Sequence, residues 1–461
     1  MPIDLAGLVE DRRADRYDLF DRHLNGQLVR VLRTLGFAVD YVRAEGPYLF
    51  DAHGNRYLDL LSGFGVFALG RNHPSVIGAL EQVLRARLPG LVQLDVPLLA
   101  GLLAERLSAH MPWLPKLFFC NSGAEAVEAA IKFSRAATGR TTILYCDHAF
   151  HGLTYGALSL CGDPSFSERF GPFLGDCVRI PFNDLEALAR ALAGREVAAF
   201  VVEPIQGKGV NLPDDHYLAE AARLCRAHGT LFVADEVQTG LGRTGRFLAS
   251  EHWQVEPDLV LLAKALSGGF VPVGAVACRR EVFDRVFDRM DRAFVHGSTF
   301  AKNDLAMAAG LATLSVLEEE GLIARAADLG ARLLEGLRQR LADCELVKAV
   351  RGKGMMIALE FQAPRSVGLR TAYALMEQAS PGLFCQLILI QLLQRQRILA
   401  QVAGHRLPVI KLLPPLVLSE ADVDWILDGF AEVIADGRSL GGMLGLGRNL
   451  AAQALRARAD A

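Results

Sequence analysis

The sequence lacks several features that would assign it to a specialised class of proteins. It has no apolar run of transmembrane length, and its first twenty residues lack the uninterrupted apolar core of a signal peptide. Its formal net charge is only −3, so a nucleic-acid partner is not expected. Charged residues make up 22% of the chain and hydrophobic residues 51%. These proportions predict a large buried core. The lack of a signal peptide and of a transmembrane run predicts a soluble, cytoplasmic protein.

Cysteine is also used sparingly. The eight cysteines form no CxxC pair and show no spacing typical of metal ligands. We therefore expect no disulfide framework and no metal site, and we interpret the cysteines as small core residues of a reducing compartment. At 461 residues the chain is long enough to form two subdomains or more.

Short apolar runs alternate with helical patterns in the middle of the chain, from about residue 74 to 320. The six runs are "KLFFC", "TILYC", "VAAFVVE", "TLFVADE", "PDLVLLA" and "PVGAVAC". Continuous apolar runs indicate strands that are buried on both faces. Their alternation with helices predicts an α/β fold with a mostly parallel central sheet.

The two ends of the chain show a different pattern. Near the N-terminus, "PYLFDAHGNRYLDLL" predicts a hairpin around Gly54 and Asn55. After residue 325 the sequence predicts a long helix, strands near 346–350 and 355–361, and a last helix around 420–434. The predicted units are an N-terminal segment (1–69) that joins the small domain, a large domain (70–325), the C-terminal small domain (326–438) and an amphipathic tail (439–461).

Three polar side chains follow three of the predicted strands. Glu203 and Asp235 end two of the runs, and Lys264 follows a third in "DLVLLAKALSGG". Because ligands bind at the carboxyl ends of parallel strands, we expect Asp235 and Lys264 to project into the same crevice. A buried ammonium costs several kcal/mol unless it is paired, neutralised or chemically altered. Taken alone, Lys264 would be interpreted as a strand-end lysine that reaches water.

A strand that leads into a helix is predicted by "FFCNSGAEAVEAAIKFSR". Its junction at Ser122, Gly123 and Ala124 would expose backbone N–H groups and the positive end of the helix dipole, which favours a phosphate. The alternative is that Ser122 is an ordinary N-cap. In "DHAFHGLTYG", Phe150 and His151 lie in a predicted loop, where an aromatic face could cover a flat heterocycle.

A phosphate cradle, an aromatic plate, a buried carboxylate and a buried lysine are the parts needed to bind pyridoxal 5′-phosphate (PLP). In that arrangement Lys264 forms a Schiff base with the cofactor, which explains its burial. The carboxylate of Asp235 keeps the pyridine nitrogen protonated, so that the ring acts as an electron sink.

Five ordered motifs resemble the class III aminotransferases, the fold-type I family that includes ornithine, acetylornithine and many ω-amine transaminases. They are "NSGAEAVEAAIKFSR", "FHGLTYGALSL", "VVEPIQGKGV", "LFVADEVQTGLGRTGRF" and "LVLLAKALSGGFVPVGAV". The resemblance covers roughly residues 48–434. It implies an aspartate-aminotransferase-like large domain, a smaller domain made from both chain ends, and a homodimer with active sites at the interface.

The resemblance also implies roles for individual residues. Lys264 would be the Schiff-base lysine and proton shuttle, and Asp235 the partner of the pyridine nitrogen. Glu203 would lie on the substrate side, where its counterpart in several family members pairs with an arginine. The residues implied to complete the cofactor site are Phe150 and Val237 on the two ring faces, Gln238 at the phenolic oxygen, the neighbouring His151, and Ser122, Gly123 and Ala124 at the phosphate, joined by Thr299 of the other subunit.

The sequence departs from the family at a position that binds substrate. Most members that use amino acids carry an arginine just before "PPL", whereas this sequence reads "VIKLLPPL", with Lys411. A lysine does not reproduce the bidentate fork of an arginine. A substrate carboxylate would then need Arg71, Arg243 or Arg406, or else the substrates differ from the usual ones. Alternatively, Lys411 merely pairs with Glu203 or reaches solvent.

Apolar segments also bear on the substrate. Residues 382–401 predict a buried helix or, alternatively, a lipid-facing or substrate-channel helix. The segment 440–461 is interpreted as an interfacial anchor or a frayed helix. Phe64, Val66 and Phe67 in "SGFGVFALG" predict an apolar substrate pocket. These features favour a hydrophobic or lipid-linked amine or aldehyde, as in the aminotransferases of hopanoid biosynthesis, and contact with a membrane surface.

Other functions stay open at the level of the sequence. An aminotransferase of the ornithine, acetylornithine or diamine type, working with glutamate and 2-oxoglutarate, would use the same cofactor residues. Another fold-type I enzyme, such as a racemase or decarboxylase, would share them too. A non-catalytic relative is disfavoured, because Lys264, Asp235 and the phosphate motif are all present.

Overall fold

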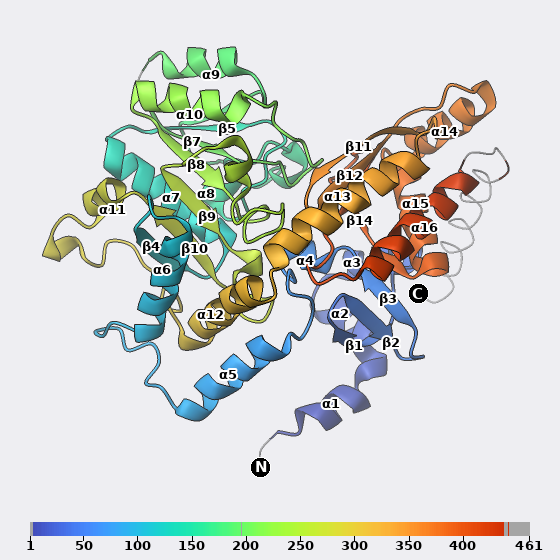
Figure 1. The fold of residues 1–461 in the computed structure, drawn as a ribbon, viewed down its shortest axis with the longest axis horizontal. Helices are drawn as coiled ribbons and strands as arrows, with labels where there is room; N and C mark the ends of the chain where they lie inside the picture. Colours follow the sequence, from blue (N-terminus) through green and yellow to red (C-terminus); the bar gives the residue numbers. More distant parts are fainter. Residues whose placement is uncertain (1–2, 195, 438–440, 442–461) are drawn as a thin grey trace.

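The computed structural model describes residues 3–194, 196–437 and 441, and it shows a large lobe beside a smaller one (Figure 1). The large lobe is built on a seven-stranded sheet in the order β4-β10-β9-β8-β7-β5-β6. Its strands are β4 (Lys116–Cys120), β5 (Thr142–Cys146), β6 (Cys177–Ile180), β7 (Val197–Val202), β8 (Leu231–Asp235), β9 (Leu259–Leu262) and β10 (Gly274–Cys278). All of its strand pairs are parallel except those of β10, which runs antiparallel to β4 and β9. The predicted mostly parallel sheet is confirmed.

The six apolar runs of the sequence all form strands of this sheet. Strands β7, β9 and β10 are buried at every position, which explains their continuous apolar pattern. The seventh strand, β6, was not predicted. It lies at the edge of the sheet, and its alternation is interrupted by two exposed residues, Val178 and Arg179, so it carries no buried-strand pattern.

Helices cover both faces of the large sheet, because its two faces bury separate clusters of apolar side chains. One face packs against α7 (Gly123–Thr138) and α11 (Arg280–Val286). The other face is covered by helices that include α6 (Leu98–His110), α9 (Leu185–Leu192), α10 (Tyr217–His228) and α12 (Asp304–Glu319), and α5 (Pro74–Ala86) packs on α12.

The smaller lobe contains two four-stranded sheets. The first has the order β1-β2-β3-β13, and the second the order β11-β12-β15-β14. Their strands are β1 (Tyr41–Glu45), β2 (Tyr48–Asp51), β3 (Arg56–Asp59), β11 (Val347–Lys353), β12 (Met356–Phe361), β13 (Ile398–Leu399), β14 (Gln401–Val402) and β15 (Val409–Leu412). The predicted hairpin is confirmed as β2 and β3, and β3 pairs in parallel with β13. Segments from both ends of the chain therefore share one sheet.

Four long helices accompany these sheets: α13 (Leu322–Arg340), α14 (Val367–Ala379), α15 (Leu383–Gln396) and α16 (Glu420–Asp436). Helix α13 packs on β11 and β12, and α16 packs on α13 and α15. Because α13 begins before residue 325 and continues beyond it, the predicted boundary at 325/326 falls inside a helix. The domain boundaries stay predictions.

The alternative of a lipid-facing or substrate-channel helix is wrong for α15 (Leu383–Gln396), although Gln401, after that helix, lines the active-site cavity. Helix α15 buries nine of its residues, from Phe384 to Leu393, against α14, α16 and the neighbouring strands. None of its residues lines the active-site cavity described below. Its apolar sequence therefore reflects a core helix with neighbours on most sides. The predicted anchor at 440–461 lies outside the described residues except for residue 441. Among the described helices, none combines the length and apolar character needed to cross a membrane.

Candidate active site

A cavity of about 770 Å³ lies between the carboxyl ends of the large sheet and the smaller lobe. The large lobe contributes the segments that follow β4, β5, β7, β8 and β9. The smaller lobe contributes residues 401–405 and Lys411 of β15, and the segment after β3 adds Phe64 and Val66. The cavity thus contains every predicted cofactor and apolar pocket residue of this chain other than Phe67 and Thr299.

Three adjacent strands place the predicted catalytic groups together. Asp235 ends β8, Glu203 follows β7 on one side, and Lys264 follows β9 on the other. The Lys264 backbone is in the left-handed region with φ +43°, which is uncommon for a residue with a side chain. Its Nζ makes no hydrogen bond or ion pair with the described residues. Burial lowers the pKa of Lys264, although the charges of Asp235 and Glu203 oppose that shift.

A buried ion pair fixes the carboxylate of Asp235. Asp235 Oδ2 lies 2.7 Å from His151 Nδ1, and Asp235 Oδ1 accepts the Val237 N–H at 3.1 Å. Burial alone would lower the pKa of His151, but the hydrogen bond and charge of Asp235 raise it above the usual value. These two contacts fix the orientation of the Asp235 carboxylate, which lines the cavity.

The N-terminus of α7 opens into the same cavity. Ser122 is its N-cap, and the Ser122 hydroxyl oxygen accepts the Glu125 N–H at 3.1 Å. The alternative of an ordinary N-cap is thus correct, and it is compatible with a phosphate site, because the first turn leaves the N–H groups of Gly123 and Ala124 without helical acceptors. A Cβ on Gly123 would lie 2.9 Å from Val237 Cγ1, so glycine is required for this close approach.

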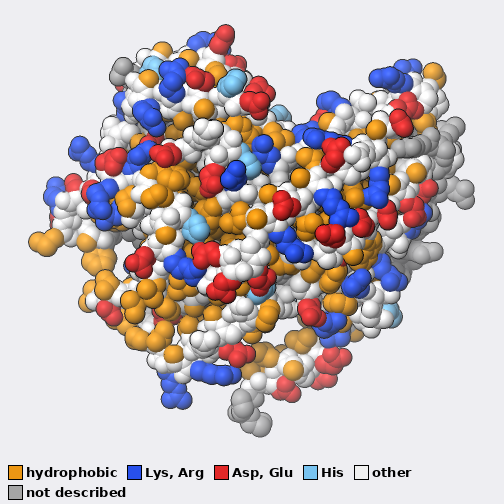
Figure 2. Space-filling view, in the orientation of Figure 1, with side chains coloured by type: hydrophobic (Ala, Val, Ile, Leu, Met, Phe, Trp, Pro, Cys, Tyr) orange, Lys and Arg blue, Asp and Glu red, His pale blue; other side chains and the backbone are white. Residues whose placement is uncertain are grey.

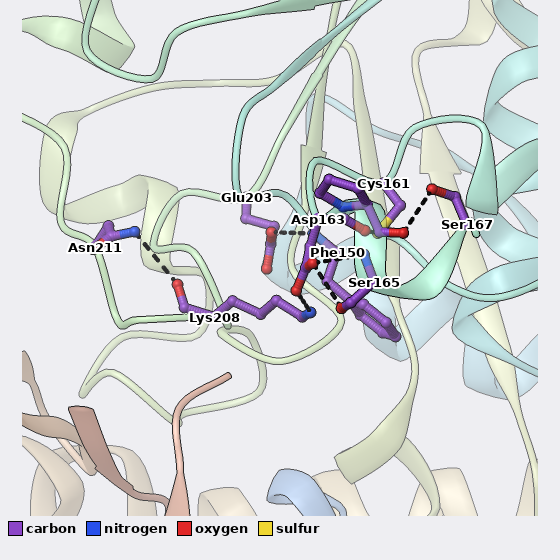
Figure 3. A network of polar contacts seen from close by, with 9 residues as sticks. Phe150, Cys161, Asp163, Ser165, Ser167, Glu203, Lys208 and Asn211 are labelled. Carbon is purple, nitrogen blue, oxygen red and sulfur yellow. Dashed lines mark hydrogen bonds and ion pairs between the residues drawn. The ribbon is translucent and has the colours of Figure 1, made fainter. Parts of the chain in front are cut away.

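Glu203 organises the wall opposite Lys264. Its Oε1 accepts the Phe150 N–H at 2.9 Å (Figure 3), and its Oε2 accepts the Gly207 N–H at 2.7 Å. Burial raises the pKa of Glu203. Both oxygens bind backbone donors, and no arginine of the described residues pairs with this carboxylate. The arginine-paired arrangement implied by the resemblance is therefore absent from the described part of the chain.

Lys411 neither pairs with Glu203 nor reaches solvent, so that alternative is wrong. Its side chain is buried, and Nζ donates to the Gly207 carbonyl at 2.6 Å and to Gln238 Oε1 at 3.1 Å. Gln238 Nε2 in turn donates to the Phe64 carbonyl at 2.9 Å. Burial, with a further contribution from the charge of Lys264, lowers the pKa of Lys411 to about 7.

The three arginines considered as carboxylate receptors are engaged elsewhere or lie outside the cavity. Arg71 makes an ion pair with Asp59 at 2.7 Å. Arg243 is fully buried and donates to backbone carbonyls of the smaller lobe. Arg406 is exposed. In the part of the chain that the structure describes, no arginine lines the active-site cavity.

Thr299 is exposed, and it does not line the cavity of its own chain. Its implied contact with the phosphate of the other subunit stays a prediction. Many cavity residues carried no prediction, among them Asn121, Phe166 and Lys208. Asn121 and Lys208 fall within quoted motifs, but their residue types alone do not predict a function in the site. Phe166 lies in a segment whose apolar residues show no helix or strand periodicity. The sequence pattern therefore did not predict that it lines the cavity.

The residues of the cavity fit PLP. An open helix N-terminus suits its phosphate, and the Asp235–His151 pair suits a protonated pyridine nitrogen. Phe150, Val237 and Lys264 line the same cavity, and Lys264 has no partner among the described residues. These positions support the cofactor roles implied for Ser122, Gly123, Ala124, Phe150, Val237 and Lys264.

Comparisons with known proteins agree with this geometry. Residues 33–434 match a family model described as class-III aminotransferase. The aminotransferase PigE of Serratia sp. (strain ATCC 39006) is 34% identical over 464 aligned positions, which cover 94% of this chain. The chain spans about half (54%) of the length of that relative.

Solved structures show the same similarity. The ornithine aminotransferase of Toxoplasma gondii ME49 has a TM-score of 0.76 and 32% identity, with 86% of this chain and 90% of that chain covered. A PLP-bound amine transaminase from an uncultivated Pseudomonas species has a TM-score of 0.77 and 30% identity, with 86% and 95% covered. The chain therefore belongs to the class III aminotransferases, a PLP-dependent family of fold type I.

Proposed function

We propose that this chain is a transaminase that moves an amino group between an amino donor and a hydrophobic aldehyde in a ping-pong cycle. The observation that carries the proposal is the character of the substrate side of the cavity. It combines apolar walls with a buried lysine, Lys411, in place of an arginine fork. Lys264 is the proposed Schiff-base residue and proton shuttle.

PLP, when bound, supplies the electron sink that stabilises negative charge on the substrate carbon. The chain supplies positioning and proton transfer. Lys264 Nζ would take the proton from the substrate carbon and later return one, which requires a neutral amine. The lowered pKa of Lys264 favours that neutral form. The Asp235–His151 pair would hold its negative charge at the pyridine nitrogen throughout the cycle.

Apolar side chains dominate the part of the cavity away from the proposed cofactor residues. Phe64 and Val66 come from the segment after β3, and Phe270 and Val271 follow Gly269. Each methylene of a substrate buried against such a surface contributes about 0.8 kcal/mol to binding. A hydrophobic chain would therefore gain affinity here, whereas a small diacid would leave charges without partners.

Lys411 is a poor receptor for an α-carboxylate. Two of its N–H donors are already used by the Gly207 carbonyl and Gln238 Oε1. An ammonium is also a point charge without the planar, bidentate geometry of a guanidinium. With a pKa of about 7, Lys411 carries a full charge only under acidic conditions. Its contacts instead support a role in orienting Gln238 toward the predicted phenolic oxygen.

An ornithine-, acetylornithine- or diamine-type activity with glutamate and 2-oxoglutarate is the second candidate. It is supported by the similarity to ornithine aminotransferases, and aliphatic walls also suit the methylene chain of ornithine. A lipid-linked substrate of the hopanoid type has less support, since α15 is a core helix. A racemase or decarboxylase function would use the same cofactor residues, but the family match favours amino transfer.

We also propose a homodimer with shared active sites. Apolar side chains gather toward the lower left of Figure 2, where Figure 1 draws α6 and the segments beside it. Two exposed apolar residues lie in segments between helices: Leu94, between α5 and α6, is 92% exposed, and Phe294, between α11 and α12, is 80% exposed. Exposed apolar surface of this kind is typical of an interface. The second of these segments also carries Thr299, the residue implied to reach the partner's phosphate site.

A screen of amino donors and acceptors tests the proposed substrate class. Glutamate, ornithine, N-acetylornithine, putrescine and long-chain amines are offered singly to the holoenzyme, and conversion of the cofactor is followed by its absorbance. We expect long-chain amines and aldehydes to react at least about tenfold more efficiently than short ones, because each added methylene is buried. Efficient turnover confined to glutamate and N-acetylornithine would contradict the hydrophobic substrate.

The pH dependence of stability tests the state of Lys411. Unfolded lysine binds its proton up to about pH 10, whereas Lys411 in the fold releases it near pH 7. The free-energy cost of burying the charged Lys411 therefore applies in full below pH 7, and it decreases as the pH rises toward 10. We expect the change in the free energy of unfolding caused by Lys411→Met to be more stabilising at pH 7 than at pH 9.5. The difference should be roughly 1 kcal/mol per pH unit. Urea unfolding of the apoenzyme measures this difference.

The matched control for that experiment is Lys348→Met, which neutralises an exposed lysine of the smaller lobe. Its effect on the free energy of unfolding is expected to be the same at both pH values. If Lys411→Met likewise changes stability by the same amount at both, then Lys411 is not a desolvated amine.

Sedimentation velocity over a range of concentrations tests the dimer. We expect Leu94→Asp and Phe294→Asp each to weaken self-association by about tenfold or more, because a buried carboxylate in an apolar interface has no partner. Leu375→Asp is the control, since Leu375 is equally apolar and 63% exposed but lies on α14. A monomeric wild-type protein, or equal dissociation of all three variants, would refute the proposed interface.

A further inference from the structure

A second cavity of about 660 Å³ lies next to the active-site cavity. Two residues, Lys208 and His405, line both cavities. Asp163 lines the second cavity, whereas Phe166, three residues later, lines the active-site cavity. Lys208 and the segment 161–167 therefore form part of the boundary between the two spaces.

An ion pair holds that boundary together. Lys208 Nζ donates to Asp163 Oδ2 at 2.6 Å (Figure 3). Asp163 Oδ1 also accepts the Ser165 N–H at 3.0 Å and the Ser165 hydroxyl at 2.7 Å. Asp163 thereby caps the short 3-10 turn Pro164–Phe166 and fixes its orientation. One carboxylate thus couples the position of Lys208 to the turn that carries Phe166.

The same ammonium group contacts an aromatic ring. Lys208 Nζ lies 3.6 Å from the centroid of the Phe166 ring, a close cation–π contact. The Phe166 ring packs edge-to-face on Phe150, with centroids 5.4 Å apart and an interplanar angle of 68°. Lys208 is only 9% exposed, so it is not a solvated surface lysine. Its charge is shared between the Asp163 carboxylate and the Phe166 ring.

The backbone on either side of Lys208 is also fixed. Gly207 donates to Glu203 and accepts from Lys411, as described above. On the other side, the Gly209 carbonyl accepts Arg351 Nη2 at 2.7 Å. Lys208 therefore projects from a loop that both lobes hold. A cation on such a loop can hold a neighbouring ring in one position.

We propose that Lys208 is a specificity-determining positioning residue: with Asp163 it holds Phe166 against Phe150, and so closes the active-site cavity toward the second cavity. Phe166 is then the wall that limits the length of the substrate chain admitted beside the cofactor site. This inference rests on the proposed function, because it concerns the chain of a hydrophobic amine or aldehyde.

The test compares the wild-type holoenzyme with Lys208→Met, Phe166→Ala and the double variant. Each reacts in single turnover with linear alkylamines from butylamine to dodecylamine, and the cofactor absorbance gives a limiting rate constant and an apparent Kd. Lys116→Met is the matched control, since Lys116 also lies over a phenylalanine ring, Phe283, but lines neither cavity.

We expect Lys208→Met and Phe166→Ala each to change the ratio of apparent Kd values for dodecylamine and butylamine by about fivefold or more. The limiting rate constants are expected to change by less than about twofold, because the groups that move protons are untouched. The double variant should behave like Phe166→Ala alone, because Lys208 acts through that ring. Lys116→Met should match the wild type.

Quenching of cofactor fluorescence by iodide provides a readout that needs no substrate. Loss of the wall should increase quenching in Lys208→Met and Phe166→Ala but not in Lys116→Met. An unchanged Kd ratio in Lys208→Met, or additive effects in the double variant, would overturn the inference while leaving the proposed function intact. If no alkylamine reacts with the wild type, the proposed function fails, and unchanged quenching would then overturn this inference as well.

Discussion

One buried carboxylate, Glu203, connects the parts of the active site that come from distant segments of the chain. Its two oxygens bind the backbone N–H groups of Phe150 and Gly207, which follow different strands of the large sheet. The Gly207 peptide then accepts Lys411 from the smaller lobe, and the next residue is Lys208. Removing this carboxylate would leave buried N–H donors unpaired on two loops, which costs about 1–3 kcal/mol each. The positions of Phe150, proposed to face the cofactor, and of Lys411 therefore depend on the same group.

Three lysines line one cavity, and their surroundings give each a different state. Lys264 faces the cofactor site without a partner among the described residues, and its lowered pKa favours the neutral amine. Lys411 is neutralised in part by burial and directs its donors to a carbonyl and an amide. Lys208 makes an ion pair with Asp163 and a cation–π contact with Phe166. Desolvation, hydrogen bonding and ion pairing thus separate three identical side chains into three roles.

The sequence was sufficient to predict the large sheet and several residues that line its cavity, because both depend on local patterns. Continuous apolar runs marked six strands, and the residues that end them, Glu203 and Asp235, marked the cavity. The edge strand β6 was missed, since a half-exposed strand has no such pattern. The contacts of Lys411 could not be predicted, because its acceptors lie 204 and 173 residues away in the chain. The buried position of α15 could not be predicted either, because buried and lipid-facing helices have similar compositions. Only the elements packed around α15 show that it is a core helix.

The most direct test concerns which of these lysines binds the cofactor. The holoenzyme is reduced with borohydride and digested, and the peptide that carries the pyridoxyl group is identified by mass spectrometry. We expect a single modified residue, Lys264, and no adduct in the Lys264→Ala variant. An adduct on Lys411 or Lys208, or no adduct in a wild-type protein saturated with PLP, would contradict it.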